Sequence, residues 1–264
     1  MKNIEVKILN PEVTHESEKM MVAMARLTQR GHNIQNMHDF EELLNKSYKD
    51  STVKTMCNLP HPTIQKFGVI NVAVVGVSRR FLGQITRHQN EVKFMSSSLQ
   101  YSNYSGKAQF VVPYEYTVAD SLIMHHKQGE TTDFYTRQYL QKCERDLHEY
   151  EKEISIVGHD AASYQLPQGL RGVLLISATP YQLKHMISQR TCNRNTLETQ
   201  YVMLKIWEEL YPLSAMYEDC GPTCMHDDCA GVCFEGKMNC GDFPQYDNPT
   251  DFLNDKFKLI RGNL

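Results

Sequence analysis

The sequence predicts an α/β chain of the α+β type, in which a central mixed sheet is flanked by helices. Residues 69–77 carry no charge and are rich in Val and Ile, which is typical of a strand buried on both faces. Residues 170–176 form a second apolar stretch with a single arginine, Arg171. Segments on either side of these stretches repeat their apolar residues at helical spacing. Together these observations predict a sheet with helices packed around it.

The chain before the first buried stretch predicts one strand and two helices. Residues 3–9 alternate apolar and polar side chains, as a half-buried strand does. Residues 17–30 predict a helix, and Gly31 is placed as its C′ glycine. Its apolar residues, which we interpret as core packing, are Met20, Met21, Met24 and Leu27. Residues 37–47 predict a second, shorter helix.

The chain after the first buried stretch turns polar within one helix. Ser78 is placed as the N-cap of a helix over residues 78–88. One face of this helix is polar, with side chains at positions i, i+3 and i+4: Gln84, Arg87 and His88. Residues 89–106 predict a long polar loop with three consecutive serines, and such loops are often functional.

The second half of the chain predicts a short strand and two helices. Residues 109–113 predict the strand, and residues 132–154 predict a long amphipathic helix. Residues 195–211 predict the last helix, which begins with Asn195 and Glu198 placed as a capping box.

The composition changes once along the chain, after residue 215. From there Cys, Gly, Pro, Asp and Asn dominate, and no internal repeat is present. A length of 264 residues allows one large domain or two small ones, at roughly 100–200 residues each. We expect one catalytic domain over residues 1–215, followed by a cysteine-rich tail over residues 216–264 that is not an independent domain.

Charge and hydropathy exclude several classes of protein. The chain has 28 Lys and Arg against 31 Asp and Glu, a formal net charge of −3, which excludes a generally basic nucleic-acid-binding surface. No apolar run approaches the roughly 20 residues of a membrane span. The first ten residues lack the apolar core of a signal peptide. We therefore expect a cytoplasmic protein with no membrane or nucleic-acid partner.

Two groups of polar residues suit an anionic ligand. The first joins Arg87 and His88 to residues 96–98, since guanidinium, hydroxyl and loop N–H groups all donate to phosphate oxygens. The alternative is a solvated helix end beside a polar loop. The second group is made of arginines: Arg171, Arg190 and Arg194. An arginine in an apolar run needs a partner, which is either a protein carboxylate or an anionic ligand.

Cysteine is the unusual residue of this chain. Of eight cysteines, five lie in the tail with the spacing C-x3-C-x4-C-x3-C-x6-C: Cys220, Cys224, Cys229, Cys233 and Cys240. Four thiolates in a tetrahedron suit structural zinc. Free thiols, an iron–sulfur cluster or a redox pair are the alternatives. The chain has no G-x-G-x-x-G, Walker A or G-x-S-x-G motif.

The order of these motifs resembles that of the flavin-dependent thymidylate synthases. Their mark is Arg-His-Arg followed after seven residues by Ser, and here Arg87-His88-Gln89 is followed after seven residues by Ser97. Gln84 stands three residues before the arginine, as in the family. His61 and Thr63 resemble the family's His-x-Thr contact to the flavin.

Downstream residues extend the resemblance. Arg171 resembles the arginine of the family's A-R-x-x-L-P segment, Arg190 its catalytic arginine, and Gln200 the glutamine of its A-Q-x-E helix. Arg194 is a rival for the catalytic role, because the interval from Arg171 to Arg190 is shorter than usual. The cysteine-rich tail is similar to one carried by some members.

Three departures from the family pattern concern nucleotide binding. Gln89 replaces the second arginine of Arg-His-Arg, and the glutamate that usually precedes the serine is missing. The family's Ser-x-Arg-Tyr falls on residues 97–100 or 98–101, and neither placement supplies its arginine. Lys93 or Lys107 could replace the missing charge.

The resemblance implies a homotetrameric methyltransferase that binds FAD and converts dUMP to dTMP with methylenetetrahydrofolate and NADPH. It implies that Arg190 is the catalytic residue, which polarises the uracil ring. The implied substrate-binding residues are Gln84, Arg87, Ser97, Ser98, Gln100, Arg171 and Arg190. The implied cofactor-binding residues are His61, Thr63, Arg87, His88, Gln89 and His185. Two alternatives are a pyrimidine nucleotide hydroxymethylase on the same scaffold and a non-catalytic, zinc-tailed binding protein.

Overall fold

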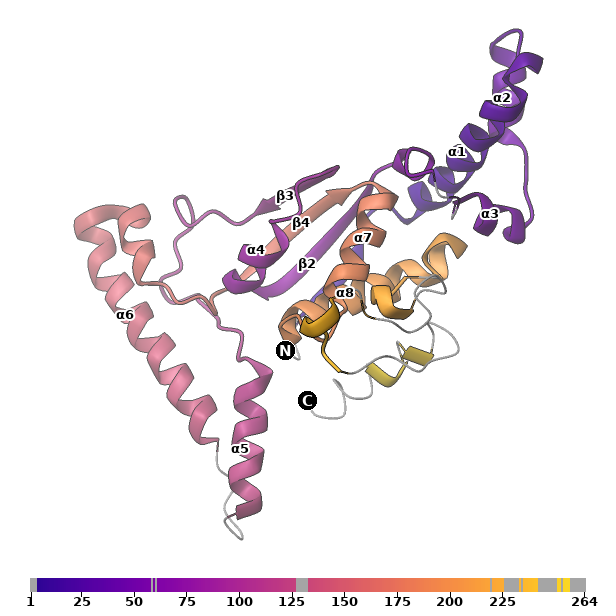
Figure 1. The fold of residues 1–264 in the computed structure, drawn as a ribbon. Coiled ribbons are helices and arrows are strands. Elements are labelled where there is room, and N and C mark those ends of the chain that lie inside the picture. Colours follow the sequence, from indigo (N-terminus) through magenta and orange to yellow (C-terminus); the bar gives the residue numbers. More distant parts are fainter. Residues whose placement is uncertain are drawn as a thin grey trace.

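The computed structural model describes residues 4–57, 59, 61–126, 133–218, 220–225, 233, 235–241, 251, 252 and 254–256, with the backbone alone over 121–126. These residues form one sheet with helices on one face and at both ends (Figure 1). Its strands are β1 (Glu5–Ile8), β2 (Ile70–Ser78), β3 (Val92–Ser96) and β4 (Arg171–Ala178). Within the described ranges, no helix combines the length and apolar character that a membrane crossing needs.

The sheet is antiparallel throughout, in the order β1-β2-β4-β3. The predicted α+β class is confirmed, but the predicted mixed sheet is wrong, since no pair of described strands is parallel. A parallel pair needs a crossover that carries the chain back to the same end of the sheet. Here each strand starts at the end where its neighbour finishes: Ser78, the last residue of β2, pairs with Arg171, the first residue of β4.

The described part of the chain contains eight α-helices. They are α1 (Pro11–Arg30), α2 (Met37–Asn45), α3 (Asp50–Cys57), α4 (Arg79–Ile85), α5 (Tyr114–His126), α6 (Phe134–Ala162), α7 (Pro180–Arg190) and α8 (Leu197–Leu210). Helices α1 to α3 lie at one end of the molecule, and α5 and α6 at the other (Figure 1). Gly158 kinks α6 with a φ of 83°, a left-handed conformation that favours glycine.

The hydrophobic core lies between the sheet and helices α7 and α8. Val74 of β2 and Leu174 of β4 are completely buried on this side, as are Ile187 of α7 and Trp207 of α8. The opposite face of the sheet is more open: Val75 and its partner Val173 are each 40% exposed. The two predicted buried stretches therefore form neighbouring strands, but one of their faces is only partly covered.

Three sequence predictions are wrong in ways that have physical causes. The predicted loop 89–106 contains β3, whose side chains are half-buried or exposed and so show no apolar run. The predicted strand 109–113 makes only a single bridge, from Phe110 to Leu170, and Pro113 at its end has no N–H to donate. The predicted capping box is absent: the N-cap of α8 is Thr196, whose side chain makes no capping hydrogen bond to the helix backbone.

Three helices were missing from the prediction, namely α3, α5 and α7. For α7 the sequence does hold a signal. Thr179 caps it by accepting a hydrogen bond from Gln182 N, and Pro180 occupies the first helical turn.

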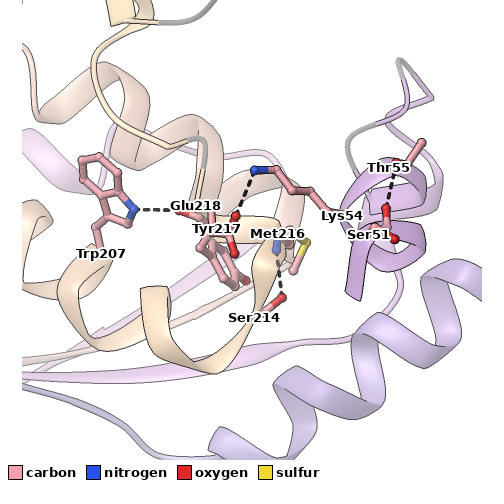
Figure 2. Close-up of polar contacts among 8 residues, drawn as sticks. All are labelled: Ser51, Lys54, Thr55, Trp207, Ser214, Met216, Tyr217 and Glu218. Carbon is pink, nitrogen blue, oxygen red and sulfur yellow. Dashed lines mark hydrogen bonds and ion pairs between the residues drawn. The ribbon is translucent and has the colours of Figure 1, made fainter. Parts of the chain in front are cut away.

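The start of the tail packs against α3 and α8 (Figure 2). Trp207 Nε1 donates to the carbonyl of Tyr217 over 2.8 Å, and Lys54 forms a 2.9 Å ion pair with Glu218. Farther on, the tail shows the short 3₁₀ turns Thr223–Met225 and Gly236–Met238. The division into residues 1–215 and 216–264 stays a prediction.

Candidate functional site

Ser78 and Glu198 join the start of α4 to α8. The Ser78 hydroxyl accepts a hydrogen bond from Phe81 N, which confirms it as the N-cap of α4. The same hydroxyl and the Ser78 N–H donate to the two Glu198 oxygens over 2.5 and 2.7 Å. Burial raises the pKa of Glu198, while the bonds from Ser78 oppose that rise. Glu198, predicted as part of a helix cap, therefore fixes the start of α4. This helix carries Gln84 but ends at Ile85, so Arg87 and His88 lie beyond it and the predicted helix over 78–88 is too long.

Gln84 is held by the first turn of α8. Its side-chain oxygen accepts hydrogen bonds from Thr196 Oγ1 at 3.0 Å and Thr199 Oγ1 at 2.5 Å. Because that oxygen is used twice, the amide Nε2 is the donor that Gln84 can offer to a ligand.

Arg190, at the end of α7, makes three hydrogen bonds to uncharged acceptors. Its Nε donates to His88 Nε2 over 2.9 Å, one terminal nitrogen donates to Asn195 Oδ1 over 3.2 Å, and the other donates to the Gln84 carbonyl over 3.3 Å. Burial and then the positive charge of Arg87 lower the pKa of Arg190. No carboxylate among the described residues pairs with Arg190 or Arg87, which leaves both charges available to an anion.

His88 is a neutral acceptor in this arrangement. Burial, followed by the charge of Arg190 and by His185, lowers the pKa of His88 to about 4. Since Nε2 accepts from Arg190, the neutral ring carries its proton on Nδ1. The side-chain amide of Gln182 lies 3.4 Å from Nδ1, and its oxygen accepts from Nδ1–H when the amide is flipped. The His185 ring meets His88 edge to face, with centroids 5.8 Å apart. Burial and Arg190 also lower the pKa of His185.

The structure thus brings together five of the predicted residues, which we call the arginine cluster: Gln84, Arg87, His88, His185 and Arg190. Sequence reasoning missed Gln182 and Asn195, which orient His88 and Arg190. Their signal is weak, because Gln182 lies 94 residues from His88, and Asn195, five residues from Arg190, belongs to the irregular turn between α7 and α8. Arg194 lies outside the cluster, in an exposed 2.6 Å ion pair with Glu235. Gln200 is buried and donates to the carbonyl of Asn195, a structural contact.

A second group of predicted residues lies where β3 ends and β4 begins. Ser97 accepts from the Tyr104 hydroxyl, and Ser98 accepts from the N–H of Gln100 over 3.1 Å. Arg171 donates to the side-chain oxygen of Gln109. This partner is a neutral amide rather than a carboxylate.

Three predicted cofactor contacts are exposed. Gln89 lies four residues beyond the end of α4, while His61 and Thr63 precede a 3₁₀ turn, Ile64–Lys66. That turn is tied to the start of α7 by Lys66, which lies over the Tyr181 ring and forms an ion pair with Glu91. The loop therefore lies on the α7 side of the molecule.

The described tail cysteines do not form the predicted zinc site. Cys220 is only 2% exposed and belongs to the hydrophobic core. Among the described residues, no group of three or more His, Cys, Asp or Glu is arranged to hold a metal ion. Cys229 lies outside the described residues, so the complete set of five stays a prediction.

The chain is similar to known proteins in both sequence and structure. Residues 11–214 match the family described as thymidylate synthase complementing protein. The flavin-dependent thymidylate synthase of Thermococcus onnurineus (strain NA1) is 25% identical over 185 residues, which cover 67% of this chain and 69% of that protein. A crystal structure of the UMP/dUMP methylase PolB from Streptomyces cacaoi, bound with 5-Br dUMP, has a TM-score of 0.61 at 17% identity and covers 81% of this chain and 93% of its own.

The structural similarity to PolB shows a shared fold. The family match over residues 11–214 spans most of the sequence. The chain therefore belongs to the thymidylate synthase complementing protein family, which is the family of the flavin-dependent thymidylate synthases.

Proposed function

We propose that this chain is a flavin-dependent thymidylate synthase, which converts dUMP to dTMP with methylenetetrahydrofolate, FAD and NADPH. The observation that carries the proposal is Arg190, a half-buried cation held by three neutral acceptors and by no described carboxylate. A fixed cation of this kind stabilises negative charge that develops on a bound ring, because its dipolar surroundings need no reorganisation.

The other residues of the arginine cluster have consistent roles in this proposal. Arg87 is exposed beside Arg190 and would bind a phosphate or carbonyl oxygen of the nucleotide. Gln84 would donate its free amide nitrogen to the same ligand. Arg171, Ser97, Ser98 and Gln100 would complete nucleotide binding from the end of β3.

The uncharged histidine rings of the arginine cluster suit FAD. His88 and His185 have lowered pKa values, so they would offer uncharged rings to a flavin at neutral pH. His61, Thr63 and Gln89 are exposed and would supply further polar contacts. When bound, FAD that NADPH has reduced supplies the hydride that turns the transferred methylene into a methyl group. The chain's own contribution is to bind, orient and polarise the nucleotide.

The expected homotetramer and cytoplasmic location belong to the same proposal. The partly exposed sheet face supports assembly, because it presents apolar side chains: Val75, Met95, Val173 and Leu175. Light scattering of the purified protein measures the assembly directly. A monomer at working concentration would contradict the tetramer but not the fold.

One set of measurements tests the proposed reaction. The purified protein should show flavin absorbance, oxidise NADPH faster when dUMP and methylenetetrahydrofolate are present, and yield dTMP by mass spectrometry. A product with an added oxygen would instead identify the hydroxymethylase alternative. Protein that binds no added FAD and turns over no pyrimidine nucleotide would leave the non-catalytic alternative.

A further inference from the structure

A pocket of about 410 Å³ lies beside Arg190 and is lined by three cysteines. Cys192 belongs to the turn between α7 and α8, while Cys224 and Cys233 belong to the tail. Arg190 and Arg194 line the same pocket. We call it the thiol pocket. Its cysteine set differs from the predicted zinc set, since Cys192 joins it and Cys220 lies in the core.

The two walls of the thiol pocket are held together by contacts around it. Ser188 of α7 and Thr223 share a 3.2 Å hydrogen bond, next to Cys224 in the chain. Arg194 pairs with Glu235, two residues beyond Cys233. These contacts keep the tail cysteines in the same pocket as Cys192, although more than thirty residues separate them in sequence.

The thiols of the pocket are close enough to influence one another. Burial raises the pKa of Cys224 to about 11, and Cys192, Cys233 and Cys240 each add to the rise, Cys192 most of the three. The described cysteines of the pocket are free thiols. They also do not form a group that could hold a metal ion. Neighbouring free thiols are suited to reversible oxidation.

Asn195 connects the thiol pocket to the arginine cluster. Its Nδ2 donates to the carbonyls of Cys192 at 3.1 Å and Gln189 at 2.8 Å. Its Oδ1 accepts from Arg190 at 3.2 Å. A displacement of the Cys192 backbone therefore moves the residue that orients Arg190.

We propose that Cys192 and Cys224 form an oxidisable pair whose disulfide ties the turn after α7 to the tail and disturbs Arg190 through Asn195. The oxidant is a small-molecule disulfide such as oxidised glutathione. The Cys192 thiolate attacks it and releases one glutathione thiolate. The Cys224 sulfur then displaces the second glutathione and loses its proton. Two protein thiols become one disulfide, and one oxidised glutathione becomes two reduced molecules.

Peptide mapping tests the disulfide independently of any activity. Full-length protein is treated with oxidised glutathione, its remaining thiols are alkylated, and it is digested without reductant. We expect a crosslinked peptide pair containing Cys192 and Cys224, lighter by two hydrogen atoms than the separate peptides and released by dithiothreitol. Cys224→Ser should abolish this species, whereas Cys233→Ser, a matched change in the same pocket, should retain it.

Other outcomes of the mapping would overturn the proposal. A disulfide between Cys224 and Cys233, or all thiols left free, would show that Cys192 is not the partner. Zinc bound in a 1:1 ratio to the reduced protein, with its thiols protected from oxidation, would identify the pocket as a metal site instead.

The effect on Arg190 needs two further readouts. Phenylglyoxal labels arginines, so labelling of Arg190, mapped by mass spectrometry, should change on oxidation in the wild type and stay constant in Cys224→Ser. The second readout rests on the proposed function: NADPH oxidation with dUMP should fall at least about tenfold on oxidation of the wild type and recover with dithiothreitol, because a displaced cation stabilises the reaction less.

The experiments can refute the proposed function and the proposed disulfide independently of each other. A reduced protein without any activity would contradict the proposed function, while the mapping and the labelling would still judge the disulfide. Unchanged labelling and unchanged activity in a protein with the mapped disulfide would refute the link through Asn195.

Discussion

Arg190 and Arg194 are four residues apart, yet their surroundings are opposite. Arg190 is half-buried and donates only to neutral acceptors, so its charge is not neutralised by the described part of the protein. Arg194 is exposed and ends in an ion pair with Glu235 on the surface. The difference teaches that the availability of a charge depends on its partner. A half-buried cation with neutral partners can serve a ligand, whereas a surface ion pair mainly joins two segments.

Replacing each arginine by alanine should give the largest difference in activity between two variants. Arg190→Ala should lower dUMP-dependent NADPH oxidation by about 10²–10³-fold, the usual cost of losing a preorganised electrostatic group. Arg194→Ala, the matched control, should change it less than about twofold, because the Glu235 pair is exposed. A larger loss for Arg194→Ala would reverse the comparison and make Arg194 the residue that serves the substrate.

The polar network behind the arginine cluster should be the next most sensitive feature. Ser78→Ala removes the cap of α4 and one of the two donors to the mostly buried Glu198. We expect the free energy of unfolding, measured in urea, to fall by about 1–3 kcal/mol. Ser102→Ala in the polar loop is the control and should stay within about 0.5 kcal/mol of the wild type. Equal effects of the two changes would show that the Ser78–Glu198 contact does not anchor the cluster.

The sequence predicts the strands and helix cap that carry these polar residues better than it predicts the hydrogen bonds between them. The buried strands β2 and β4 and the Ser78 cap follow local rules of burial and helix capping, and the structure contains all of them. The predicted polar helix face is only partly present, because α4 ends at Ile85 and leaves Arg87 and His88 beyond it. The bond from Arg190 to His88 joins residues 102 positions apart, and the bond from Ser78 to Glu198 spans 120 positions. No local pattern determines such a pairing, because the fold must first bring α4, α7 and α8 together.

The cysteine-rich tail also shows that local patterns do not determine long-range contacts. The spacing of its cysteines predicts one zinc site, but spacing cannot reveal that Cys220 fills the core or that Cys192 and Cys224 line one pocket. Both outcomes depend on how the tail docks on α3 and α8 (Figure 2). The half-exposed strand β3 is missed for a related reason, since an edge strand with one open face needs no apolar run.

His88 should make stability depend on pH. Its pKa is about 4 in the folded chain, below the ordinary value of 6.5. Between pH 6.5 and 4 the unfolded chain takes up a proton that folded His88 refuses, so the free energy of unfolding falls as the pH falls. From pH 7 to pH 5 we expect a loss of about 1 kcal/mol, which allows for partial access of water.

Urea titrations at both pH values measure this dependence. His88→Gln keeps an acceptor for Arg190 and should reduce the loss, whereas His38→Gln, at an exposed histidine of α2, should leave it unchanged. A loss that is the same in all three proteins would assign the pH effect to other groups. It would also weaken the view that the arginine cluster holds a neutral imidazole.

The smallest effect should come from the ion pair that joins α3 to the tail. Lys54 and Glu218 are 43% and 39% exposed, so water already solvates both charges, and Lys54→Ala should cost less than about 1 kcal/mol. The buried hydrogen bond from Trp207 to the Tyr217 carbonyl secures the same segment, and Trp207→Phe should cost more, by leaving that carbonyl unpaired. Urea unfolding compares the two variants. If Lys54→Ala were the more damaging, surface charge rather than burial would hold the tail, and the contrast between Arg190 and Arg194 would lose its physical basis.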